Sequence, residues 1–180
     1  IDLQINSIVI RHGSIKYRCM SEKIKTNTFS LNNINLKHIS GHIILDKLSN
    51  DSLDVKVKRL SFEENSGLRF KKISFKLSAS KNNFKLDNLN VEMPASKLHV
   101  DSIDAAYILE KNRLNFSSLT FRGSLSDSYL TPSDIAFCQP LLKDINNKIY
   151  FNANLYGHDG NIYVTRLRIH EKENLFNLKS

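Results

Sequence analysis

The chain has 180 residues, enough for one ordinary domain. Its formal net charge is +8 and its pI is near 9.5. No apolar run approaches the length of a membrane-spanning helix or of the apolar part of a signal peptide, which excludes both from these 180 residues.

One spacing, apolar-x-apolar-x-x-apolar-x-apolar, recurs eight times along the chain. Of the 32 intervening residues, 30 are polar or charged, and the exceptions are Val9 and Tyr163. The eight copies occupy residues 3–10, 29–36, 55–62, 68–75, 84–91, 98–105, 114–121 and 162–169. This pattern predicts one-sided β-strands, because apolar residues two apart lie on the same side of a strand.

The three-residue gap in each copy would turn the second half of a flat strand to the wrong face. A β-bulge at the central polar pair would restore the face, and a two-residue turn there would make a hairpin instead. We favour bulges, since no central pair is Asn-Gly or Asp-Gly and three-residue arms are short for a hairpin. Because bulges increase twist and bend, the sheet is expected to curl.

The distance between copies predicts how the strands connect. Steps of 13 to 16 residues fit one strand and a turn, as in an antiparallel meander, and steps of 26 leave room for a second, weaker strand. Weaker strands are expected at 15–17, 43–45 and 149–155. Turn-forming residues predict turns at Gly13, Gly41, 49–51, 65–67, 81–83, 111–112, Gly157 and 159–160.

Residues 132–145 break the strand pattern and predict one short helix. Thr131 is the expected N-cap, Pro132 the first helical residue and Asp134 a favourable charge near the helix start. Ile135, Cys138, Leu142 and Ile145 follow at helical spacing. Pro140 predicts that this helix is kinked or split.

The positive charge is explained most simply by a lysine-rich, solvated strand face. Basic residues are frequent from Lys47 to Lys85, and nucleic acid or anionic lipid headgroups are the alternative partners. We expect no nucleic-acid binding, because no zinc ligand set, single-strand-binding module or arginine-rich arm accompanies these residues. Cys19 and Cys138 are 119 positions apart and fit buried thiols or, in an oxidising compartment, a disulfide.

No motif of an enzyme occurs in the sequence. There is no nucleophile elbow, phosphate-binding loop or paired metal-ligand spacing. His38 and His42 flank Gly41 in a strand-and-turn region, and His158 precedes the predicted turn at 159–160. We therefore expect no enzymatic activity, no metal site and no cofactor.

The function should depend on what covers the shared apolar face, because exposing so much apolar surface to water is unfavourable. Burying each such side chain stabilises by roughly 1.5–3 kcal/mol. The cover could be a second sheet in a closed β-sandwich, the 132–145 helix laid across a U-shaped sheet, or acyl chains held in an open U. Pattern alone favours the sandwich, which would act as a structural or adhesin-like interaction module.

The repeated texture, as in residues 84–91, resembles the AsmA-like family and its TamB branch, the translocation and assembly module subunit in its Bacteroides-type form. Other segments similar to that family are 50–62, 66–68, 94–98 and 133–136 followed by Pro140 and Leu141. The resemblance covers most of the chain, although each motif alone has low specificity. The family's N-terminal anchor and C-terminal region are not recognisable, so residues 1–180 are expected to be one β-repeat segment from the middle of a longer chain, with a helical insert at about 132–145.

The resemblance implies an all-β fold, an elongated and curved antiparallel sheet called a β-taco or repeating β-groove. It implies a periplasmic location in a Gram-negative bacterium, anchorage of the full protein in the inner membrane, phospholipid transport between membranes and outer-membrane biogenesis. The implied partners are phospholipid acyl chains and, through regions outside this segment, an outer-membrane barrel assembly protein. The residues expected to line the lipid groove are Ile5, Ile10, Leu31, Leu36, Val57, Phe62, Phe70, Phe75, Leu86, Val91, Val100, Phe116, Leu119, Phe121, Val164 and Ile169.

Overall fold

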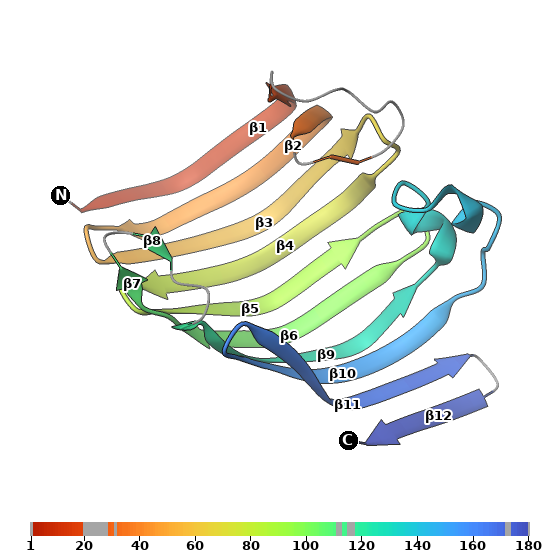
Figure 1. Cartoon of the computed structure of the whole chain (residues 1–180). Helices are drawn as coiled ribbons and strands as arrows, with labels where there is room; N and C mark the ends of the chain where they lie inside the picture. The colour runs from red at the N-terminus through yellow and green to blue at the C-terminus, as the bar shows by residue number, and fades with distance from the viewer. Residues whose placement is uncertain are drawn as a thin grey trace.

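The chain folds into one open, curved antiparallel sheet of ten strands, with a separate two-stranded hairpin (Figure 1). This all-β, curved antiparallel architecture confirms the expected fold class. The computed structural model describes residues 2–19, 29–30, 32–110, 113–114, 118–171 and 174–179.

The strands of the large sheet follow one another as a meander. Their bounds are β1 Leu3–Arg18, β2 Asn33–Leu48, β3 Ser52–Glu64, β4 Arg69–Ser80, β5 Asn83–Glu92, β6 Lys97–Ala106, β9 Thr120–Leu130, β10 Ile149–His158, β11 Asn161–Glu171 and β12 Asn174–Lys179. Each strand pairs with the next in chain order, except that β6 pairs with β9. The chain between β6 and β9 contains the hairpin strands β7 (Leu109–Glu110) and β8 (Arg113–Leu114).

Six of the eight repeats form single strands, and all six contain a register shift at the polar pair. These are residues 3–10, 55–62, 68–75, 84–91, 98–105 and 162–169, of which 68–75 begins one residue before β4. Such shifts are what a β-bulge produces. The bulges proposed from the sequence are therefore confirmed in these strands.

Several shifts are marked by a polar residue with positive φ. His12, His38, Asn88 and Asp127 have φ between 45° and 54°, and each lies within a register shift. Asn, Asp and His adopt this left-handed conformation more readily than other non-glycine residues. Asn88 belongs to the central polar pair of its repeat, whereas His12, His38 and Asp127 mark bulges outside the repeats.

The repeats at 29–36 and 114–121 were expected to be strands, and this is wrong for both. Asn32 lies in a turn and β2 begins only at Asn33, while Leu119 precedes β9 and is not in a strand. In both copies the central pair consists of small polar residues, Asn32-Asn33 and Ser117-Ser118, which favour turns and breaks. Leu31 and Phe116, two expected groove residues in these copies, lie outside the described residues.

The turns expected at three glycines are also wrong, because Gly13, Gly41 and Gly157 lie inside strands. As a result the weaker strands at 15–17 and 43–45 are parts of the 16-residue strands β1 and β2. Gly157 is required by packing: a Cβ there would lie 2.0 Å from Cε1 of Phe121. The turn at Asp159-Gly160 is confirmed, with φ of 50° and 73°, as a tight β-hairpin of this sequence needs.

The expected helix at 132–145 is two short 3₁₀ turns, Pro132–Ile135 and Pro140–Leu142, on either side of residues 136–139. Thr131 does not cap the first turn with its side chain. Its hydroxyl instead donates to the Ala95 carbonyl at 2.7 Å, and Asp134 accepts from the Ala95 amide at 2.7 Å. These bonds hold the segment at the β5–β6 turn, and with two prolines so close together they leave no room for a regular α-helix.

Glu64, at the end of β3, is a buried carboxylate that links β2 to the turn between β3 and β4. Its carboxylate accepts hydrogen bonds from the backbone amides of Asn35 at 3.2 Å and Ser66 at 2.7 Å. Burial raises the pKa of Glu64, but hydrogen bonds from Ser66 and from the Asn35 amide together lower it by more. The pKa of Glu64 therefore lies below its ordinary value. The charged form therefore stabilises the fold.

Replacing Glu64 with Gln is expected to lower the free energy of unfolding at neutral pH by about 1–3 kcal/mol, because an amide nitrogen would face a buried N–H donor. The folded-state pKa lies below the unfolded value, so the carboxylate's contribution is complete above the unfolded pKa of about 4.3 and is lost as pH falls through the folded pKa. Urea denaturation at several pH values measures both effects. Glu63→Gln, which breaks only a surface pair with Arg69, is the control and should cost less than about 1 kcal/mol. Equal losses in the two variants would contradict this role for Glu64.

Candidate functional site

Apolar residues on neighbouring strands lie directly opposite one another and form rows that cross the sheet. One row runs unbroken from β1 to β11, with a glycine at β9. Its members are Ile5, Leu45, Val55, Leu77, Leu86, Ile103, Gly123, Leu155 and Val164. Directly opposed residues of an antiparallel pair share a face, so this row is one continuous apolar band.

Three further rows lie on the same face. The second is interrupted only at the register shift between Phe75 and Leu89, and its members are Ile8, Ile43, Val57, Phe75, Leu89, Val100, Leu125, Ala153 and Leu167. The third consists of Ile10, Gly41, Leu60, Ile73, Val91 and Leu98. The fourth consists of Leu3, Leu48, Leu53, Ala79, Phe84, Ala105, Phe121, Gly157 and Ile162.

Most of the expected groove residues are brought together in these rows. Those in the four rows are Ile5, Ile10, Val57, Phe75, Leu86, Val91, Val100, Phe121 and Val164. Phe62 and Phe70 face each other across β3 and β4 with ring centroids 5.0 Å apart, and Ile169 is opposite Phe151. Leu36 is opposite Glu64 at the edge of the face, and Leu119 is half-buried outside the strands.

Sequence reasoning missed the row members that it assigned to no strand, among them Leu48, Leu53, Leu77 and Leu125. Each lies outside the eight repeats. The available signal was simple alternation, as in Phe75-Lys76-Leu77, which continues a strand beyond the repeat without another bulge.

The apolar face is the more shielded side of the sheet. Val57 and Val100 are 5% and 8% exposed, although the neighbouring Lys56 and Lys58 are exposed. In a single sheet, side chains converge and shield one another only on the inside of the curve. We conclude that the apolar rows line the concave side. Shielding fades toward the sheet margins, where Ile162 and Val164 of β11 are 69% and 43% exposed.

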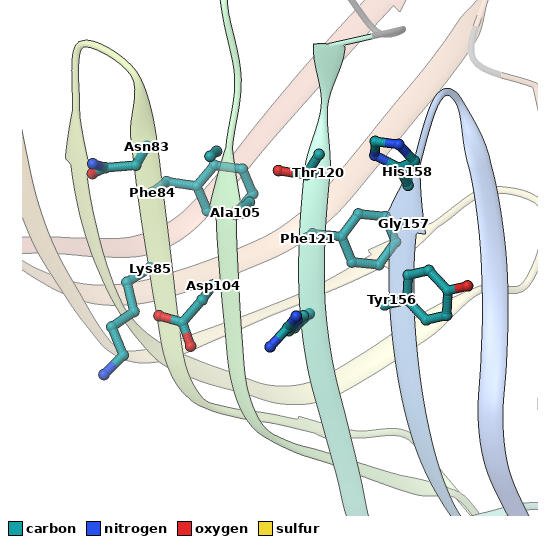
Figure 2. Close-up of a pocket in the computed structure, with 12 residues that line it drawn as sticks. Asn83, Phe84, Lys85, Asp104, Ala105, Thr120, Phe121, Tyr156, Gly157 and His158 are labelled. Carbon is teal, nitrogen blue, oxygen red and sulfur yellow. The ribbon is translucent and has the colours of Figure 1, made fainter.

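A pocket of about 750 Å³ lies at one end of the curved sheet, at the ends of β5, β6, β9 and β10. Figure 2 shows its residues in neighbouring strands, with Phe84 and Phe121 among them and the Phe121 ring beside Gly157. Lys85, Asp104 and Tyr156 from the polar face also line it. This end therefore combines apolar and charged groups within one opening.

At the opposite strand ends, two connections far apart in the strand order touch. The Phe29 ring meets the Phe137 ring edge-on, with centroids 5.9 Å apart. Phe29 precedes β2, and Phe137 lies between β9 and β10, five places further along the sheet. In a flat sheet strands that far apart would be separated by roughly 24 Å, so this contact fits a strongly curved sheet.

The described residues contain no group of three or more histidine, cysteine, aspartate or glutamate side chains that could hold a metal ion. Cys19 and Cys138 are not joined by a disulfide. No helix within the described ranges is long and apolar enough to cross a membrane. His158 Nε2 lies 3.1 Å from the Asp159 carboxylate in the exposed β10–β11 turn, and His42 Nε2 lies 3.2 Å from the Ser7 hydroxyl.

Comparison of the chain with protein-family models, with curated proteins and with solved structures gives no match.

Proposed function

We propose that this chain is a segment of a lipid-binding groove in the periplasm of a Gram-negative bacterium, where it supports phospholipid transport between membranes and outer-membrane biogenesis. The observation that carries the proposal is the set of four apolar rows on the concave face, with no second sheet packed on the large one among the described residues. Acyl chains are the natural cover for an elongated apolar surface of this kind.

The rows provide a path rather than a single pocket. Each strand of the large sheet from β1 to β11 contributes an apolar residue to several rows, so an acyl chain lying across these strands meets the same surface at every step. Contacts of this kind are non-directional and scale with area, so they hold a chain without fixing its position. Headgroups would remain in water along the open side. The protein needs no catalytic residue for this task.

The alternative of an adhesin-like module assumed a closed β-sandwich. The described strands form one open sheet and a small hairpin, so the sandwich is not the observed fold. No particular feature of the described residues favours adhesion over lipid binding.

Native mass spectrometry of the chain, purified and then incubated with phosphatidylglycerol in a mild detergent, tests the proposal. We expect adducts of one or more phospholipid masses that persist when the detergent is removed by gentle activation. A soluble sugar phosphate at the same concentration is the control for non-specific adducts. A spectrum of bare protein under these conditions would contradict lipid binding by this segment.

A further inference from the structure

Two pairs of consecutive basic residues, Lys58-Arg59 and Lys71-Lys72, lie at bulges of β3 and β4 on the polar, convex face. Lys58 and Arg59 occupy the shift between Val57 and Leu60, and the shift in β4 falls at 71–72. Because the apolar residues on both sides of each pair face the concave side, both members of the pair project from the other face. A bulge thus doubles the density of cations that a regular strand would offer there.

These residues gather around a cleft of about 720 Å³ on that face, which we call the basic cleft. Its charged and titratable lining consists of Lys58, Arg59, Arg69, Lys71, Lys72, Glu63, Glu92 and His38. Five cations and two carboxylates give a formal charge of +3 with histidine neutral. Its charged pairs project from the opposite side of the sheet from the apolar rows, and Phe62 and Phe70 of the apolar side also line it.

The cations of the basic cleft are only partly neutralised. Arg69 pairs with Glu63 at 2.9 Å, and Lys72 lies 4.0 Å from Glu92. Among the described residues, neither Lys58 nor Arg59 has a carboxylate within ion-pair distance, and Lys71 donates to the Pro94 carbonyl at 3.1 Å. Three cations therefore lack a counter-charge.

The next row of the same face carries both signs of charge. Lys56 lies opposite Lys76 on β4, and Lys76 also lies opposite Asp87 on β5. The charge that a bound anion would balance is therefore that of the cleft itself.

We propose that the basic cleft binds a compact anion carrying two or more phosphate groups. Its volume falls in the range of small-molecule sites, and arginine and lysine are the side chains best suited to phosphate oxygens. Nucleic acid is less suited, because a single strand needs exposed aromatic rings on which bases stack. The aromatic residues of the cleft, Phe62 and Phe70, pack against each other.

Phosphate groups could come from a soluble polyphosphate or from a lipid headgroup, and two probes separate these sources. Tripolyphosphate is titrated into the folded chain by calorimetry, and phosphatidylcholine vesicles with or without cardiolipin, whose headgroup carries two phosphates, are tested by flotation. The variant is Lys58→Gln with Lys71→Gln. The matched control is Lys16→Gln with Lys47→Gln, two exposed lysines outside the cleft that change the net charge equally.

The cleft variant should bind at least about tenfold more weakly to one or both probes, since it removes two cations that would donate charge-assisted hydrogen bonds to phosphate oxygens. The control should retain its affinity. Binding of tripolyphosphate would assign a soluble ligand, and binding of the anionic vesicles alone would assign a headgroup. Absence of saturable binding to both probes, or equal losses in both double variants, would overturn the proposal. So would an affinity for oligothymidylate that rises with its length and exceeds that for tripolyphosphate.

Discussion

Replacing Leu86 with Asp is expected to abolish phospholipid binding while the sheet remains folded. Leu86 lies near the middle of the first apolar row, between Leu77 and Ile103. An acyl chain crossing this row would have to desolvate the new carboxylate, which costs several kcal/mol unless a partner charge is present. Without lipid the face is open to water, so the carboxylate stays hydrated and the free energy of unfolding should fall by only about 1–3 kcal/mol.

The same strand supplies a matched control. Asn88→Asp adds the same negative charge two positions away, but at the bulge on the polar face. Asn88 is exposed and has φ 53°, a conformation that Asp also accepts. This variant should retain phospholipid adducts in native mass spectra, whereas Leu86→Asp should lose at least nine-tenths of them, roughly a tenfold weaker binding or about 1.4 kcal/mol.

Two results would count against the groove. If Leu86→Asp kept its adducts, the apolar rows would not be the lipid site. If it unfolded outright while Asn88→Asp did not, the face would be covered in the folded protein by something other than lipid. Chemical denaturation of both variants separates these outcomes.

Much of this fold could be predicted from the sequence because the bulged repeat fixes both the strand type and the apolar face. Residues 84–91 show this clearly: the spacing places Phe84, Leu86, Leu89 and Val91 on one side, and the register agrees. The polar pair Asp87-Asn88 marks the shift. In such a strand the local pattern and the tertiary structure favour the same arrangement.

The sequence-based predictions are wrong where a residue type can serve more than one structural role. Gly157 looks like a turn former, but it lies within β10 because the Phe121 ring needs the space that a Cβ would fill. Thr131 looks like a helix cap, but its hydroxyl bonds the Ala95 carbonyl on another connection. Neither the ring nor that carbonyl is local in sequence, so no pattern in the neighbouring residues could reveal the competing contact.

The candidate site was predictable as a face but not as a set of rows. The repeats identify which residues point to the same side, whereas the row membership depends on register shifts in both partners of each strand pair. Leu125, which lies in no repeat, joins Val100 and Ala153 only through shifts near Asp101 and Asp127. The gathering of Lys58 and Lys71 in one cleft likewise follows from two bulges that lie side by side, which spacing along the chain does not reveal.

Deleting Asn90 is expected to damage the fold far more than deleting Asn88. Removing Asn88 turns residues 84–91 into a strictly alternating strand, so Leu89 and Val91 stay on the apolar face and only the bulge is lost. Removing Asn90 leaves the bulge but makes Leu89 and Val91 adjacent, which sends Val91 to the polar face and turns Glu92 inward. It also removes the 2.8 Å contact between the Asn90 side chain and His99.

The Asn90 deletion should lower the free energy of unfolding by about 3 kcal/mol or more, since one apolar side chain is exposed and a carboxylate is brought to the apolar face. The Asn88 deletion should lose less, because the register toward β4 becomes regular and only that toward β6 gains a shift. Urea denaturation followed by circular dichroism compares the two, and small-angle scattering reports whether the sheet without its Asn88 bulge becomes flatter. Equal losses of unfolding free energy in the two variants would contradict this account. They would mean that the bulge does not serve to keep the apolar side chains of the strand on one face.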